Sequence, residues 1–237
     1  MYAAFSHPQQ GHQDRPISGT KDLVAALPRA IGTANNTLAI ASIRPTQITV
    51  GFREVAEKRR RIRAALDTSG IVERRVIPVV LGPDLNHYAL DRHHRLAALI
   101  AEGFTRAPVR VVADFRHSSP SGFWIDMDRR GWCRPFDAEG RRTDYSEIPS
   151  SIAALSDDPF RSLASALRRI GGHPKDRKLF SEFAWADYLR GLISVEELNA
   201  SFEAALDTAL LLSLAPLRKD ILTPRASAEK HDENERS

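Results

Sequence analysis

The chain has 237 residues, of which 42% are hydrophobic, and its formal net charge is +4 with a pI near 9.4. This length suffices for one domain with a hydrophobic core and an attached helical region. The single cysteine, Cys133, excludes an internal disulfide framework and a multi-cysteine zinc site. No apolar run reaches the roughly 18 residues of a membrane span, and the N-terminal sequence lacks a secretory pattern. We therefore expect a cytoplasmic protein without a membrane partner.

Composition predicts four segments along the chain. Residues 1–20 and 223–237 are polar and have the composition of disordered termini. Residues 21–117 are expected to form an α/β domain, and residues 118–222 a helical C-terminal region. The basic excess is small and mixed with 30 acidic residues, so charge gives only weak support to nucleic-acid binding.

The first half of the chain alternates between strand and helix patterns. Apolar runs predict strands at 37–43, 76–81, 87–90 and 109–115, with helices at 52–66 and from 91 onwards. In the first helix Phe52, Val55, Ile62 and Leu66 fall on one face, which is expected to be buried. The order β, α, β, β, α, β is too short for a doubly wound nucleotide fold. It favours an α/β (α+β) class, a small mixed sheet with packed helices.

Helical patterns dominate after residue 118. We expect helices at 123–130, 157–170, 179–189 and 194–214. The helix expected at 157–170 begins at Asp157-Asp158-Pro159 and ends at Gly171-Gly172. Ser194 and Glu197 form a capping box, which predicts one long helix continuing through Leu214.

The most distinctive stretch is Asp91-Arg-His-His-Arg95, at a strand-to-helix turn. The first amides of a helix lack internal partners, and the helix dipole places partial positive charge there. Four basic side chains at this place predict a phosphate site. The expected contacts are Arg92, His93, His94 and, above all, Arg95, with Arg44 and Lys58 as weaker candidates. Alternatively, Arg95 forms an ordinary pair with Asp91.

The paired histidines have two further interpretations. Neighbouring residues on a helix point about 100° apart, so His93 and His94 cannot both ligate one metal ion without distortion. No histidine pair has the i,i+4 spacing of helical zinc sites, and we predict no metal ligand set. The remaining alternative is one buried, hydrogen-bonded histidine and one surface histidine.

Chemistry on a phosphate group needs charge neutralisation and often a base. Asp91, His93 and Glu54 are the catalytic candidates, because they can be placed near the basic turn. Asp91 alternatively caps the helix, orients Arg95 or holds a hydrated Mg²⁺. The sequence contains no glycine-rich Walker loop. It leaves open whether the acids of the helical half, Asp157, Asp158 and Glu182, face the site.

These motifs resemble the ParB/sulfiredoxin superfamily, and the closer resemblance is to the ParB-like nuclease family. The matching stretches, in order, are Arg44-Pro-Thr-Gln47, Pro78-Val-Val-Leu-Gly-Pro83, Asp91-Arg-His-His-Arg95, Phe123-Trp124, Gly131-Trp132, Asp157-Asp-Pro-Phe-Arg-Ser-Leu-Ala164, Glu182-Phe183 and Trp185-Ala186. The resemblance covers about residues 40–190. It implies a compact α/β fold that binds nucleotide phosphates at this helix start, with ATP or ADP and Mg²⁺ as the implied cofactors.

Three kinds of relative imply different activities. Sulfiredoxins carry a catalytic cysteine where this chain has His93, which excludes their chemistry. Free serine kinases carry Asp-Gly-His-His-Arg, which this chain matches except for Arg92. Their catalytic carboxylate corresponds to Gln47, which by resemblance lies across the nucleotide site; an amide cannot act as a base. We therefore expect slow or absent transfer to free serine. Partition proteins add a helix-turn-helix, for which we find no basic recognition helix.

We therefore expect a ParB/sulfiredoxin-like domain with an all-helical C-terminal region. Its expected function is to bind a nucleotide or another phosphate ligand, with phosphoester hydrolysis or phosphoryl transfer as the candidate chemistry. One alternative is a nucleic-acid-binding ParB-like nuclease or partition-type protein, for which we expect weak, non-specific DNA binding. The other alternative is a non-catalytic scaffold.

Overall fold

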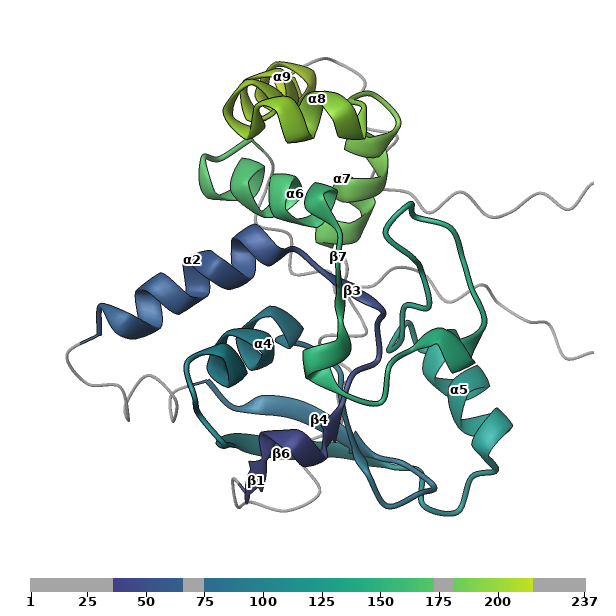
Figure 1. Cartoon of the computed structure of the whole chain (residues 1–237). Helices are drawn as coiled ribbons and strands as arrows, with labels where there is room; N and C mark the ends of the chain where they lie inside the picture. The colour runs from purple at the N-terminus through teal and green to yellow at the C-terminus, as the bar shows by residue number, and fades with distance from the viewer. Residues whose placement is uncertain (1–35, 66–74, 173–180, 215–237) are drawn as a thin grey trace, which may run out of the picture.

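The computed structural model describes residues 36–65, 75–172 and 181–214 (Figure 1). The strands are β1 (Asn36–Ala39), β2 (Ile43–Arg44), β3 (Thr49–Val50), β4 (Ile77–Leu81), β5 (His87–Ala89), β6 (Arg106–Asp114) and β7 (Ser156–Asp157). The helices are α2 (Phe52–Arg63), α4 (His93–Ala101), α5 (Pro120–Arg129), α6 (Pro159–Arg169), α7 (Ser181–Arg190), α8 (Val195–Ala200) and α9 (Phe202–Leu214), with 3-10 turns η1 (Ile40–Ser42), η2 (Tyr145–Glu147) and η3 (Ile152–Ala154). The expected disordered termini lie outside the described residues.

A five-stranded mixed sheet forms the base of the molecule, with the strand order β1-β6-β4-β5-β2. β4 pairs in parallel with β6 and antiparallel with β5, while β1 is antiparallel to β6 and β2 is parallel to β5. This arrangement confirms the expected fold class, a small mixed sheet with packed helices followed by a helical C-terminal part. No helix within the described ranges is long and apolar enough to cross a membrane.

Helices cover both faces of the sheet, because neighbouring strand residues point to opposite sides. Ile77 and Val79 belong to the core shared with α2 and α4. Val80 belongs to a second core, with Phe123 and Met127 of α5. Figure 1 shows α4 directly over the sheet, α2 above α4, and α5 to the right of the sheet.

The helical part is joined to the α/β part by the short parallel pair β3–β7. The amide of Asp158 donates to the Val50 carbonyl at 2.8 Å, and the amide of Phe52 donates to Asp157 Oδ1 at 2.6 Å. One carboxylate from the second half of the chain therefore holds the first turn of α2. Above this junction α6, α7, α8 and α9 pack around a core of their own (Figure 1).

Three details of the predicted elements were wrong. The strand predicted at 37–43 is interrupted by η1, since this turn brings Ile40 and Ile43 into the same core, whereas strand residues three apart face opposite sides. The long helix at 194–214 is broken at Ser201, whose hydroxyl accepts the Ala204 amide at 3.2 Å and caps α9. Phe52 is 51% exposed, because the core between α2 and α4 begins at Val55. Leu66 lies outside the described residues.

Candidate phosphate-binding site

A cavity of about 590 Å³ lies between α2, the start of α4, and the facing ends of α6 and α7. We call it the basic cavity. Its lining residues are Glu54, Lys58, Arg61 and Ile62 of α2, Arg75, Asp91, Arg92, His94 and Arg95 around the start of α4, Arg168 of α6, and Glu182 of α7. Six of these side chains are cationic and three are carboxylates, while Ile62 is the single aliphatic one. Such a lining suits a ligand with high negative charge and little apolar surface.

The start of α4 provides backbone donors at this cavity. Arg92 is the N-cap in a left-handed conformation, with φ 69° and ψ 26°, and its side chain caps no amide. Asp91 Oδ1 accepts the Arg92 amide at 2.6 Å, so this carboxylate holds the turn and does not cap the helix. The Arg95 amide reaches back to the Arg92 carbonyl at 2.9 Å. Within the described residues, the amides of His93 and His94 have no acceptor, as an anion site at a helix start requires.

Both histidines hold the loop that leads into α2. His93 Nε2 accepts the Thr46 amide at 3.2 Å, and His94 Nε2 accepts the Gly51 amide at 3.0 Å. Burial, followed by the nearby positive charge of Arg161, lowers the pKa of His93 to about 3 and that of His94 well below its usual value. Both rings are therefore neutral and carry their proton on Nδ1. His94 also lines the basic cavity, so it can contribute a neutral N–H donor there.

Two carboxylates at the cavity, Glu54 and Glu182, are engaged by cations. Lys58 Nζ donates to Glu54 Oε1 at 2.7 Å, and Arg169 of α6 donates to Glu54 Oε2. Across the cavity Glu182 is paired with Arg168 and accepts a hydrogen bond from the Ser165 hydroxyl at 3.2 Å. These contacts join α2 and α7 to α6.

The described residues contain no group of three or more histidine, cysteine, aspartate or glutamate side chains arranged to hold a metal ion. Each of the three cavity carboxylates already accepts from a cation or a backbone amide. The donor set therefore does not fit a resident metal ion. Lysine and arginine supply the positive charge of this cavity, and a divalent cation would have to enter together with the ligand.

Other predicted site residues lie outside the basic cavity. Gln47 is buried, and its Nε2 donates to the Thr49 carbonyl at 2.6 Å, within its own loop. Arg44 pairs with Asp84 at 3.0 Å and lies over the Tyr88 ring. Together with His93, these residues support the loop and strand beside the cavity and do not line it.

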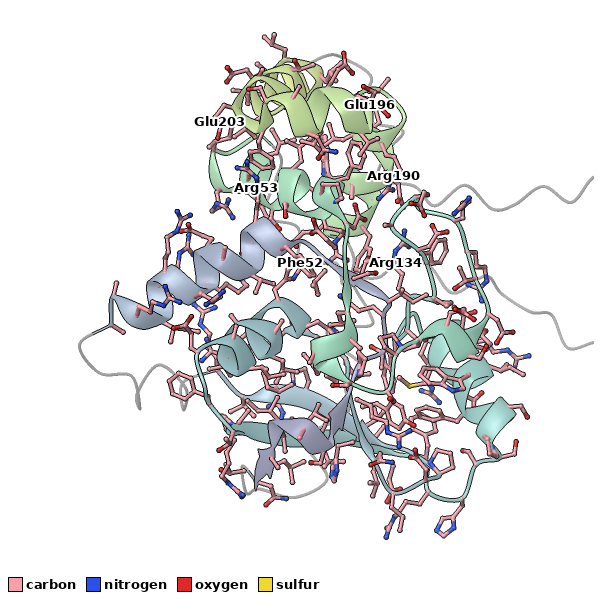
Figure 2. All side chains as sticks on the ribbon, viewed as in Figure 1. Phe52, Arg53, Arg134, Arg190, Glu196 and Glu203 are labelled. Atoms are coloured by element: carbon pink, nitrogen blue, oxygen red, sulfur yellow. The ribbon has the colours of Figure 1, made fainter. Side chains whose placement is uncertain are left out.

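The sequence left open whether Asp157, Asp158 and Glu182 of the helical half face the site. Asp157 accepts the Phe52 amide, and Asp158 caps α6 while pairing with Arg190 at 2.6 Å, so both hold the junction between the two parts. Glu182 lines the basic cavity. Figure 2 shows Arg190 and Arg134 on facing sides of this junction, where both pair with Asp187.

Three cations of the cavity, Arg61, Arg75 and Arg168, are not among the site residues predicted from the sequence. Arg61 belongs to the charged run of α2, which has the pattern of a solvated helix face. Arg168 follows the expected helix start by about ten residues, and only the packing of α6 on α2 brings it to the cavity. No local signal in the sequence marks these residues as part of one site.

The fold recurs in a known structure, and the sequence matches a family model. The family model described as "Putative ParB-like nuclease" matches residues 36–191. The crystal structure of protein Atu1540 from Agrobacterium tumefaciens is similar, with 44% sequence identity and a TM-score of 0.73, over 77% of this chain and 92% of that one. No curated protein matches the sequence.

Proposed function

This chain belongs to the ParB-like nuclease family, and we propose that its basic cavity binds a small molecule with more than one phosphate group, such as ADP or ATP. The observation that carries the proposal is that six cationic side chains line the same cavity as the start of α4, where the first-turn amides have no acceptor among the described residues. A phosphate group at this place accepts from the amides and from charged donors at once.

Five of the six cations form two groups, which is why we propose a ligand with at least two phosphates; the sixth, Arg168, is paired with Glu182. The pKa of Arg95 is lowered, first by burial and then by repulsion from the nearby positive charges of Arg75 and Arg92. An anion between them would relieve this repulsion. Lys58 and Arg61 line the cavity from α2. In this arrangement one phosphate lies at the start of α4, and the next lies against α2.

We propose Glu54 and Asp91 as the carboxylates that can take a proton from a nucleophile. Both oxygens of Glu54 are engaged, by Lys58 and by Arg169. A phosphate group that competes for Lys58 would release one of these oxygens. Hydrolysis or phosphoryl transfer would then begin only after the ligand is bound.

The second candidate function is hydrolysis of phosphodiesters in nucleic acid, and the family description is the observation that favours it. The same cations would neutralise one backbone phosphate. Duplex DNA binding across a salt series and cleavage of a labelled strand test this candidate. We expect weak, salt-sensitive binding, and tight sequence-selective binding would place this candidate first.

Calorimetry tests the proposed function with pyrophosphate, ADP and ATP, each with and without Mg²⁺. Arg95→Ala should weaken binding by about tenfold or more, since a charge-assisted hydrogen bond contributes about 1.5–3 kcal/mol. The matched control is Arg116→Ala, which removes an exposed arginine paired with Asp114 away from the cavity. Thermal unfolding of each variant verifies the fold. If none of the three ligands binds the wild type, the proposal is refuted and a scaffold role is favoured.

A further inference from the structure

A second groove, of about 530 Å³, lies on the other side of α2, between α2, α6 and α9. We call it the α2–α9 groove. Its floor consists of Ala56, Ala166, Ile170, Phe202 and Leu206, and its rim carries Arg53, Arg59, Arg60, Arg63 and Arg169 with two acids, Glu57 and Glu203. Figure 1 shows the groove's three helices one above another. Figure 2 labels Arg53 of α2 and Glu203 of α9, which pair with each other at one end of the groove. The groove therefore combines an apolar floor with a strongly basic rim.

The rim keeps excess positive charge because its arginines share carboxylates. Glu102 accepts from Nε of Arg59 at 2.7 Å and from Nε of Arg63 at 2.6 Å. Two guanidinium groups thus share one negative charge. Both bind through Nε, and among the described residues their terminal Nη groups have no acceptor. These groups remain able to bind another anion.

The same sharing recurs one turn away on α2. Glu57 accepts from Arg60 and also from Arg61, at 3.1 Å in the second pair. Arg53 lies 3.7 Å from Glu203, an exposed pair that contributes little to stability. A series of incompletely neutralised arginines therefore runs along α2 beside the groove. Such a series is complementary to a partner with several negative charges.

The floor decides which kind of acidic partner fits. Ile170 is 50% exposed at the end of α6. Phe202 is the single aromatic residue of the lining, and the Arg53 guanidinium lies 4.1 Å from its ring centroid. One face of that ring is therefore covered, which leaves little for the successive base stacking that single-stranded nucleic acid needs. Aliphatic side chains of a polypeptide match Ala56, Ala166 and Leu206 better.

We propose that the α2–α9 groove docks an acidic amphipathic helix of a partner protein. The partner's apolar face lies on the floor. Its carboxylates bind the terminal Nη groups of Arg59 and Arg63, and they compete with Glu57 for the guanidinium of Arg60. This is recognition of a helix in a groove, with apolar anchors at helical spacing. The site is separate from the basic cavity, although α2 lines both.

Fluorescence anisotropy of the full chain tests the proposal with a labelled synthetic peptide of about 18 residues, a length that supports helix formation. The peptide has leucine on one helical face and glutamate on the other. We expect saturable binding that weakens with salt. Arg60→Ala/Arg63→Ala should weaken it by about tenfold, equivalent to about 1.4 kcal/mol. Ile170→Ser should weaken it at unchanged salt dependence.

The matched control is Arg116→Ala/Arg141→Ala, which removes two exposed, carboxylate-paired arginines elsewhere and should leave the affinity unchanged. A polyglutamate peptide without leucine and a single-stranded oligonucleotide separate the classes of partner. The proposal is overturned if the leucine–glutamate peptide does not bind. It is also overturned if polyglutamate or the oligonucleotide binds more tightly, or if the groove variants behave like the control.

Discussion

Replacing Gly51 with alanine should loosen the junction that holds the candidate site. The Gly51 amide donates to His94 Nε2 at 3.0 Å, and its carbonyl accepts the Val55 amide at 3.0 Å. A Cβ atom at this position would lie 2.4 Å from Ser162 Oγ and 2.6 Å from the Ser162 backbone nitrogen. The hydroxyl can rotate away, but the nitrogen belongs to the first turns of α6. Alanine therefore fits only if α6 or the loop before α2 moves.

The expected cost is about 2–4 kcal/mol of unfolding free energy. Overpacking contributes about 1–3 kcal/mol, and a weakened buried hydrogen bond to His94 contributes about 1 kcal/mol. Urea denaturation measures the total. Gly191→Ala is the control, since its Cβ would meet nothing closer than 3.4 Å. The Gly51→Ala variant should also bind pyrophosphate more weakly. Equal stability of the two variants would refute the close contact between α6 and the loop.

Three further predictions concern the turn and its supports. Arg92→Gly removes the strain of a left-handed backbone at a non-glycine residue, so it should raise the unfolding free energy by about 1 kcal/mol, measured by urea denaturation. The same variant should bind pyrophosphate more weakly in calorimetry. A lower unfolding free energy would contradict this reasoning. The depressed pKa of His93, about 3, means that its neutral form stabilises the fold above pH 6.5 and that this contribution is lost as the pH falls from 6.5 towards 3. Denaturation midpoints at pH 7.5, 5.5 and 4.5 measure this, and midpoints independent of pH would refute it. Gln47→Glu places a buried carboxylate against the Thr49 carbonyl and should lower the unfolding free energy by about 1–3 kcal/mol. Urea denaturation measures the change, with Gln47→Met as a size-matched control. Phosphoserine formation from ATP by Gln47→Glu and wild type tests whether a carboxylate at this position also raises turnover.

Local patterns predicted most of the fold. Three local signals predict elements that the structure contains. They are the β-branched run before Gly82 for β4, the Asp-Pro start for α6 and the Ser194 capping box for α8. Each depends on interactions between residues close in the sequence. The break at Ser201 was missed because apolar spacing continues across it, and one hydroxyl cap decides the outcome. Such a competition between helix continuation and capping is too close to resolve from sequence.

The candidate site was predictable only in part. The start of α4 could be identified, because basic residues at a strand-to-helix turn have a direct physical consequence there. The roles of Arg168 and Glu182 depend on the packing of α6 and α7 against α2, which is set by contacts far apart in the sequence. Arg92 illustrates a third case. Its backbone is left-handed, with φ 69°, a conformation that glycine adopts more readily than arginine, and the side chain gives no sign of it in the sequence.

The most direct test of the phosphate site is an NMR titration of the ¹⁵N-labelled protein with pyrophosphate. We predict saturable shifts that are largest at the backbone amides of His93 and His94 and at Nδ1 of the His94 ring. His94 lines the basic cavity, and the His93 amide lies in the same first turn of α4. Shifts confined to the α2–α9 groove, or no saturable shift at these amides, would contradict the proposal that this turn binds phosphate.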